Sequence, residues 1–148
     1  MIQESLASLF ERDLTKLATE INAYSNEKII WQIQDGILNS GGNLSLHLIG
    51  NLKHFIGKTL GKIDFERERE KEFTNTNIPV PVLIAEINMT KEIVVATLQK
   101  LTDQTLETIY PINVFNVELT TTQFLIHLYG HLNYHLGQIN YHRRMLDV

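Results

Sequence analysis

The sequence contains no cysteine among its 148 residues, which excludes disulfides, thiolate metal ligands and a cysteine nucleophile. Any thiol chemistry would therefore need a thiol supplied by a small molecule. No apolar run approaches the roughly 20 residues of a membrane-spanning helix. The first residues, MIQESLASLFERD, have neither the basic segment nor the apolar core of a signal peptide. We therefore expect a cytoplasmic protein with no membrane partner.

Positive charge is also scarce, because 13 lysines and arginines face 17 acidic residues and leave a formal net charge of −4. Without a basic block, a nucleic-acid partner is not expected. The most charged stretch, DFEREREKEFTNTNIP at 64–79, alternates in sign, and we interpret it as an exposed connection. Glycine-rich phosphate loops and the G-x-S-x-G motif of serine hydrolases are both missing.

Helical periodicity is the main pattern that is present. Apolar residues recur every three or four positions in 4–24, and similar patterns occupy 44–63, 79–107 and 120–146. The length and the 43% hydrophobic content fit one domain, 1–148, with a sizeable core. The connections are too long for a simple up-and-down arrangement, so we predict an all-α four-helix bundle with long crossover connections.

Local motifs predict some of the helix ends. Thr120 and Gln123 have the spacing of a capping box at the start of the last helix. Asn43 or Ser45 is the expected cap of the 44–63 helix. The β-branched and aromatic stretch 108–122 predicts a short strand or an extended crossover.

Histidines are concentrated near the end of the chain, where four of the six lie within FLIHLYGHLNYHLGQINYHRRML, 124–146. Residues four apart on a helix have Cβ atoms about 6 Å apart, close enough for two imidazoles to bind one metal ion. His131 could therefore pair with His135 or with His127. A third ligand could come from His47 or His54, which are seven residues apart on one stripe of the 44–63 helix.

Such a three-histidine site would leave an open coordination position, which is typical of catalytic metal sites. The alternative is that these histidines pack in the core or at an interface. The His-Glu-x-x-His motif of zinc proteases is absent, because Leu132 follows His131. Glu-x-x-His pairs are absent too, which disfavours a di-iron carboxylate site.

Two stretches resemble the DinB-like superfamily, which includes the bacillithiol-transferase-like proteins. HLNYHLGQI, 131–139, is similar to its fourth-helix signature of two histidines four apart followed by Gly-Gln. LSLHLIGNLKHFI, 44–56, is similar to its second-helix motif. Trp31 before the SGG turn and the RERE…EF connection resemble one uncharacterised branch. The resemblance implies a four-helix bundle with long crossovers.

The resemblance also implies a divalent metal, commonly nickel or zinc, bound by His47, His131 and His135, and a homodimer. Relatives transfer low-molecular-weight thiols or hydrolyse small substrates. Tyr134 and Leu136 stand where the family often has a histidine and a basic residue, so the substrate chemistry stays open.

Three further residues are candidates for the same region. His54 is a rival ligand, whereas His127 and Gln138 are expected to support a ligand or line the pocket. His142, near the chain end, is expected to be a surface or interface residue. The resulting hypothesis is a metal-dependent hydrolase or thiol transferase that acts on a small molecule, with an external thiol as a possible cofactor and no assigned catalytic residue. The alternative is a helical bundle that binds a metal or ligand without turnover.

Overall fold

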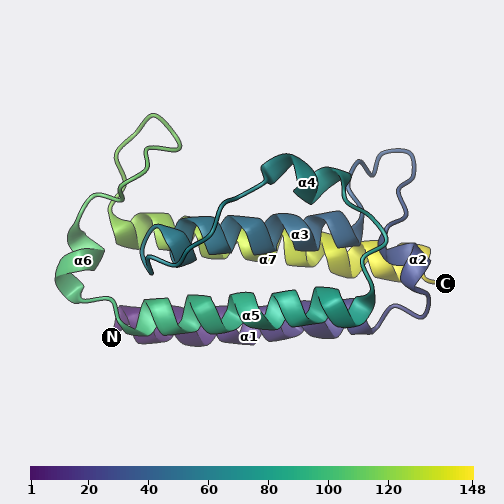
Figure 1. Cartoon of the computed structure of the whole chain (residues 1–148), viewed down its shortest axis with the longest axis horizontal. Coiled ribbons are helices and arrows are strands. Elements are labelled where there is room, and N and C mark those ends of the chain that lie inside the picture. The colour runs from purple at the N-terminus through teal and green to yellow at the C-terminus, as the bar shows by residue number, and fades with distance from the viewer.

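Four long helices form a bundle in the computed structural model, which describes residues 1–148 (Figure 1). They are α1 (Ile2–Asn22), α3 (Gly41–Leu52), α5 (Val80–Gln99) and α7 (Thr121–Leu146), and α3 continues into the π-helix η1 (Lys53–Lys58). Figure 1 shows α1 and α7 running in one direction and α3 and α5 in the other, so the α3–α5 connection crosses the length of the bundle. The predicted all-α bundle with long crossovers is therefore confirmed.

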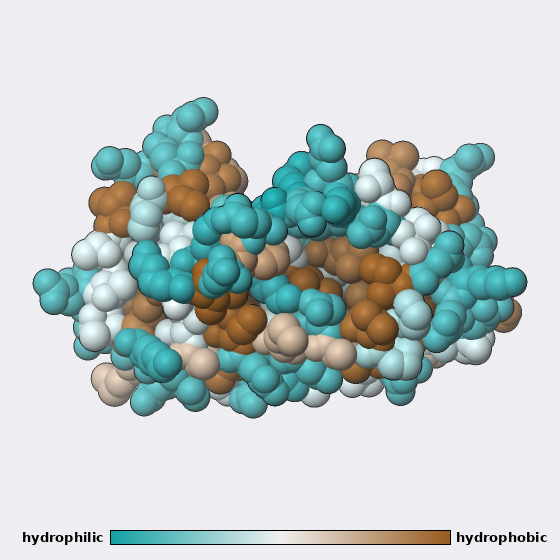
Figure 2. All heavy atoms as spheres, viewed as in Figure 1, coloured by the Kyte–Doolittle hydropathy of each residue, from teal (hydrophilic) through white to brown (hydrophobic).

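Short helices occupy the connections. They are α2 (Glu27–Ile30), α4 (Arg69–Thr74) and α6 (Asp103–Glu107). The 108–122 stretch forms no strand and makes only an isolated bridge between Ile109 and Thr120, so the extended crossover is the correct alternative. Its 109–117 segment carries exposed apolar side chains, which form the brown area at the upper left of Figure 2. None of the helices is long and apolar enough to cross a lipid bilayer.

The core is one cluster of 25 buried hydrophobic residues contributed by all four long helices. The stripe predicted in α1 is buried in it, including Phe10, Leu14 and Leu17. Burial of each large apolar side chain contributes about 1.5–3 kcal/mol, so this cluster is the main source of stability.

The ends of two helices test the predicted caps. The capping box of α7 is confirmed, since Thr120 Oγ1 accepts from the Gln123 N–H at 3.1 Å and Gln123 Oε1 accepts from the Thr120 N–H at 2.9 Å. The predicted cap of α3 is wrong, because the Ser40 hydroxyl accepts from the Asn43 N–H at 3.0 Å. The helix starts earlier because Gly41 and Gly42 pack against the rings of Tyr24 and Trp31, where any Cβ would overlap.

Two other predictions require correction. The 79–107 helix is two helices, because α5 ends at Gln99 and a new helix, α6, begins after Thr102, whose hydroxyl accepts from the Thr105 N–H at 3.1 Å. The 64–79 segment is not wholly exposed. It contains α4, which packs on α3 and carries the buried Glu72. Its carboxylate is paired inside the protein, which explains how a charge from so polar a segment can be buried.

Candidate metal centre

His47 of α3 lies opposite His131 and His135 of α7, and the three imidazoles converge. His131 Nε2 lies 3.1 Å from His47 Nε2 and 3.1 Å from His135 Nε2. One potential ligand atom from each residue lies within 4.8 Å of the other two. The four-residue spacing directs both α7 rings to one side, and the packing of α3 against α7 brings the third.

These separations fit a shared metal ion. Nitrogens bound about 2.0–2.1 Å from one ion, in octahedral to tetrahedral geometry, are roughly 2.9–3.4 Å apart. The observed 3.1 Å distances fall in that range. The donor set therefore fits zinc, nickel and other divalent ions that accept imidazole nitrogen.

Two hydrogen bonds fix which ring nitrogens carry protons. Glu72 Oε1 lies 3.0 Å from His47 Nδ1, and Gln138 Oε1 lies 2.7 Å from His135 Nδ1. Since both oxygens accept, each Nδ1 donates, and the lone pairs are on the Nε2 atoms. Two lone pairs therefore point into the same small region, an arrangement that a cation would stabilise.

Glu72 is itself held on both oxygens by Arg67, through Nε at 2.8 Å and Nη2 at 2.9 Å. Burial alone would raise the pKa of Glu72, but the hydrogen bonds from His47 and Arg67 outweigh it and lower the pKa below its ordinary value. Gly50 allows the Glu72 side chain to lie directly against α3, because a Cβ at position 50 would overlap the Glu72 carboxylate. The carboxylate is therefore a charged and rigid support for His47.

His131 and His135, the two α7 histidines of the candidate centre, are held in the neutral form. Burial is the main cause that lowers the pKa of His131, and together with the neighbouring histidines and Arg67 it brings this pKa to about 4. Burial also lowers the pKa of His135, although its bond to Gln138 partly opposes this. Near pH 7 both rings are therefore in the neutral form that binds metal ions.

The remaining predicted residues lie around the centre or apart from it. The His127 ring stacks on His131, with centroids 6.3 Å apart, and also contacts Phe115. The three-residue cluster includes His47 and not His54. His54 packs on Phe55 instead, and its buried Nδ1 has no partner.

The surface assignment of His142 is wrong, because this ring is buried. Its Nε2 donates to the Gln32 carbonyl at 2.8 Å, so Nδ1 accepts from the Tyr24 hydroxyl at 2.7 Å. His142 thus joins α7 to the segment between α1 and α3. Sequence reasoning also missed Glu72, since no local pattern indicates a contact across 25 residues.

A cavity of about 470 Å³ adjoins the centre at His135 and Gln138. The 36–39 loop and Leu44 form one wall, and α7 forms the other. None of the lining residues is a lysine, arginine, aspartate or glutamate. The cavity therefore suits a small molecule without strong charge.

Comparison with known proteins gives the family and the fold. Residues 3–148 match the model of a family described as "Protein of unknown function (DUF1572)". The crystal structure of a DinB-like protein from Bacillus cereus ATCC 10987 is similar, with a TM-score of 0.68 and 20% identity over 89% of this chain and 84% of that one. No curated protein matches. The chain therefore belongs to the DUF1572 family, a DinB-like family, and has the all-α fold of DinB-like proteins.

Proposed function

We propose that this protein is a divalent-metal-dependent enzyme that holds its ion with His47, His131 and His135. The observation that carries the proposal is the convergence of three Nε2 atoms, two of them with tautomers fixed by Glu72 and Gln138. Three protein ligands leave a coordination position open, as catalytic metal sites require.

The reaction that this site supports is hydrolysis, or transfer of a low-molecular-weight thiol, on a small substrate. A bound divalent ion supplies Lewis acidity and makes a nucleophile available at neutral pH. The chain contributes the rest: Glu72 and Gln138 keep the Nδ1 protons in place, and Arg67 keeps Glu72 ionised. The Phe73 ring, 5.0 Å from the His47 ring, shields that side from water.

Nickel and zinc are the proposed metals, because both bind imidazole nitrogen well. A thiol substrate would have to be external, since the chain has no cysteine. We propose a cytoplasmic location for this activity, because small thiols are kept reduced there. The uncharged cavity beside His135 is the proposed substrate site.

A second candidate is a bundle that binds a metal or ligand without turnover. One observation favours it. Glu72, the buried carboxylate nearest the centre, is occupied by Arg67 and His47, so it is not free to act as a general base.

The two candidates differ in turnover. Protein made without a histidine tag and loaded with nickel or zinc would be assayed with p-nitrophenyl acetate and with a thiol plus 1-chloro-2,4-dinitrobenzene. Enzyme function predicts metal-dependent turnover that His135→Ala abolishes. Stoichiometric metal with no turnover in either assay would favour the binding protein instead.

A further inference from the structure

The three imidazoles of the candidate centre are not held alike. The Nδ1 atoms of His47 and His135 each have an acceptor, but the buried Nδ1 of His131 has no hydrogen-bond partner. Because His131 faces the other two rings with its Nε2, it can share an ion with them only if its proton is on Nδ1. A buried N–H group of this kind needs an acceptor.

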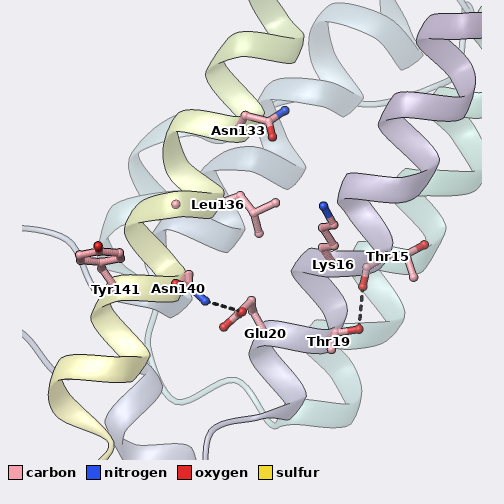
Figure 3. A pocket seen from close by; sticks show the side chains of 9 residues that line it. Thr15, Lys16, Thr19, Glu20, Asn133, Leu136, Asn140 and Tyr141 are labelled. Atoms are coloured by element: carbon pink, nitrogen blue, oxygen red, sulfur yellow. Dashed lines mark hydrogen bonds between the residues drawn. The ribbon is translucent and has the colours of Figure 1, made fainter.

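Asn51 of α3 carries a buried acceptor that also has no partner. Its side chain belongs to a residue that is only 7% exposed, and its Oδ1 makes no hydrogen bond. Other asparagines of the bundle are bonded to protein atoms. Asn43 donates to the Glu72 carbonyl at 3.0 Å. Asn140 donates to Glu20 Oε1 at 2.7 Å, beside a groove of about 420 Å³ between α7 and α1 (Figure 3). Since a buried oxygen without a partner is unfavourable, Asn51 requires an explanation.

Helix geometry places Asn51 beside His131. Asn51 follows His47 by four residues, so both lie on the side of α3 that faces α7. The ring centroids of His47 and His131 are 5.0 Å apart, and further along the two helices those of Phe55 and Phe124 are 5.3 Å apart. Because α3 and α7 run antiparallel, position 51, midway between 47 and 55, is level with the α7 turn that ends at His131 (Figure 1).

Two other histidines of this region do not supply the acceptor. The His127 ring lies over the His131 ring, with centroids 6.3 Å apart and an interplanar angle of 29°. That contact is face to face, whereas a ring N–H points along the plane of its own ring. His54, whose Nδ1 is also buried without a partner, lies three residues beyond Asn51 on α3 and is therefore farther from the centre. Asn51 Oδ1 is the buried acceptor that remains.

We propose that Asn51 is a positioning residue that holds His131 through one buried water. The water accepts from the Nδ1–H group of His131 and donates to Asn51 Oδ1. A water is needed because the two atoms do not bond each other directly, and such a bridge is nearly as favourable as a direct hydrogen bond. This inference rests on the metal centre proposed above and gives its third ligand the support that the other two already have.

The bridge matters because His131 has two tautomers to choose from. Its Nε2 lies 3.1 Å from the Nε2 atoms of His47 and His135, whose protons are on Nδ1. A His131 with its proton on Nε2 donates to one of these lone pairs, and its Nε2 then has no lone pair for an ion. An acceptor at Nδ1 favours the other tautomer. Asn51 therefore favours the form of His131 that binds metal, without contacting the metal itself.

The first test is zinc affinity, measured on untagged proteins by competition with a chromogenic chelator. Asn51→Leu removes the acceptor at similar size and should bind zinc about 10- to 100-fold more weakly than the wild type. Asn51→Asp should bind zinc at least as tightly as the wild type, because a carboxylate accepts at the same place. His54→Leu is the matched control, since it removes another buried atom without a partner from α3, and it should bind zinc like the wild type.

The outcomes separate this inference from the metal centre. A wild type that binds no zinc would overturn both. Equal zinc affinity in the wild type and Asn51→Leu would overturn the role of Asn51 alone. A loss in Asn51→Asp as large as that in Asn51→Leu, or an equal loss in His54→Leu, would mean that the packing of α3 is the cause and would also overturn it.

The second test observes the proton itself by nitrogen-15 NMR of the histidine rings. In the zinc-loaded wild type, His131 should carry its proton on Nδ1, and that proton should exchange slowly with solvent and show a cross-peak to a bound water. In Asn51→Leu with saturating zinc, the same proton should exchange at least about tenfold faster, because its acceptor is lost. An equal exchange rate in the two proteins, or a wild-type His131 with its proton on Nε2, would contradict the role of Asn51.

Discussion

At the residue scale, the candidate centre depends on side chains that never contact the metal. Glu72 and Gln138 fix the Nδ1 protons of His47 and His135, and Arg67 fixes Glu72 in turn. Partners of this kind typically change metal affinity 10- to 100-fold. Glu72 therefore gives a sharper test than a ligand does, because its removal leaves all three imidazoles present.

Glu72→Gln should weaken zinc binding by about 10- to 100-fold, because a neutral amide polarises His47 less and loses the charge that holds Arg67. Glu70→Gln changes an exposed residue of the same helix and should bind zinc like the wild type. Competition with a chromogenic chelator measures both affinities. Equal affinity in the two variants would mean that Glu72 does not support the site.

Asp13 has a different role at the same scale, since it is buried away from the centre between α1 and α7. Burial would raise its pKa, but hydrogen bonds from Arg12, Tyr129 and Asn133 lower it to about 2. The folded pKa thus lies below the unfolded value of about 3.9. Asp13 therefore stabilises the fold above about pH 4, and this contribution, about 2 kcal/mol, is lost as the pH falls towards 2.

Asp13→Asn should accordingly lower the free energy of unfolding by about 2 kcal/mol at pH 7 and by much less near pH 2. Urea unfolding of both proteins at several pH values measures this difference. A pH-independent difference between the two proteins would show that ionisation of Asp13 is not the cause.

At the element scale, local sequence patterns predicted where the long helices lie. Contacts between residues far apart in the sequence determined the start of α3 and the burial of Glu72. The apolar stripe of α1, the capping box at Thr120 and the His131–His135 pair all depend on neighbours within one helix. Spacing left His47 and His54 as alternatives, and only the family resemblance chose between them. The Ser40 cap and the burial of Glu72 follow from tertiary packing, which a single sequence does not display.

The packing of α4 on α3 can be tested at Gly50. Gly50→Ala places a Cβ into the Glu72 carboxylate, and overpacking of this kind typically costs about 1–3 kcal/mol. Glu72→Ala removes the obstructing atoms, so the double variant should be more stable than the sum of the single effects predicts. Thermal unfolding of the four proteins measures the coupling. Strictly additive effects would contradict this contact.

At the scale of the whole molecule, the bundle brings together residues more than 80 positions apart in the sequence. The crossover through α4 makes α3 antiparallel to α7 and lays Glu72 against His47 (Figure 1). The candidate metal centre and the cavity beside it therefore share α7.

The most direct test of the three-histidine centre is the metal stoichiometry of the untagged protein, measured by calorimetric titration with zinc and with nickel. A three-histidine centre predicts one ion per chain for the wild type and none for His131→Ala, with the helical circular dichroism spectrum unchanged. A wild type that binds no ion, or a His131→Ala variant that binds one with equal affinity, would contradict the three-histidine centre.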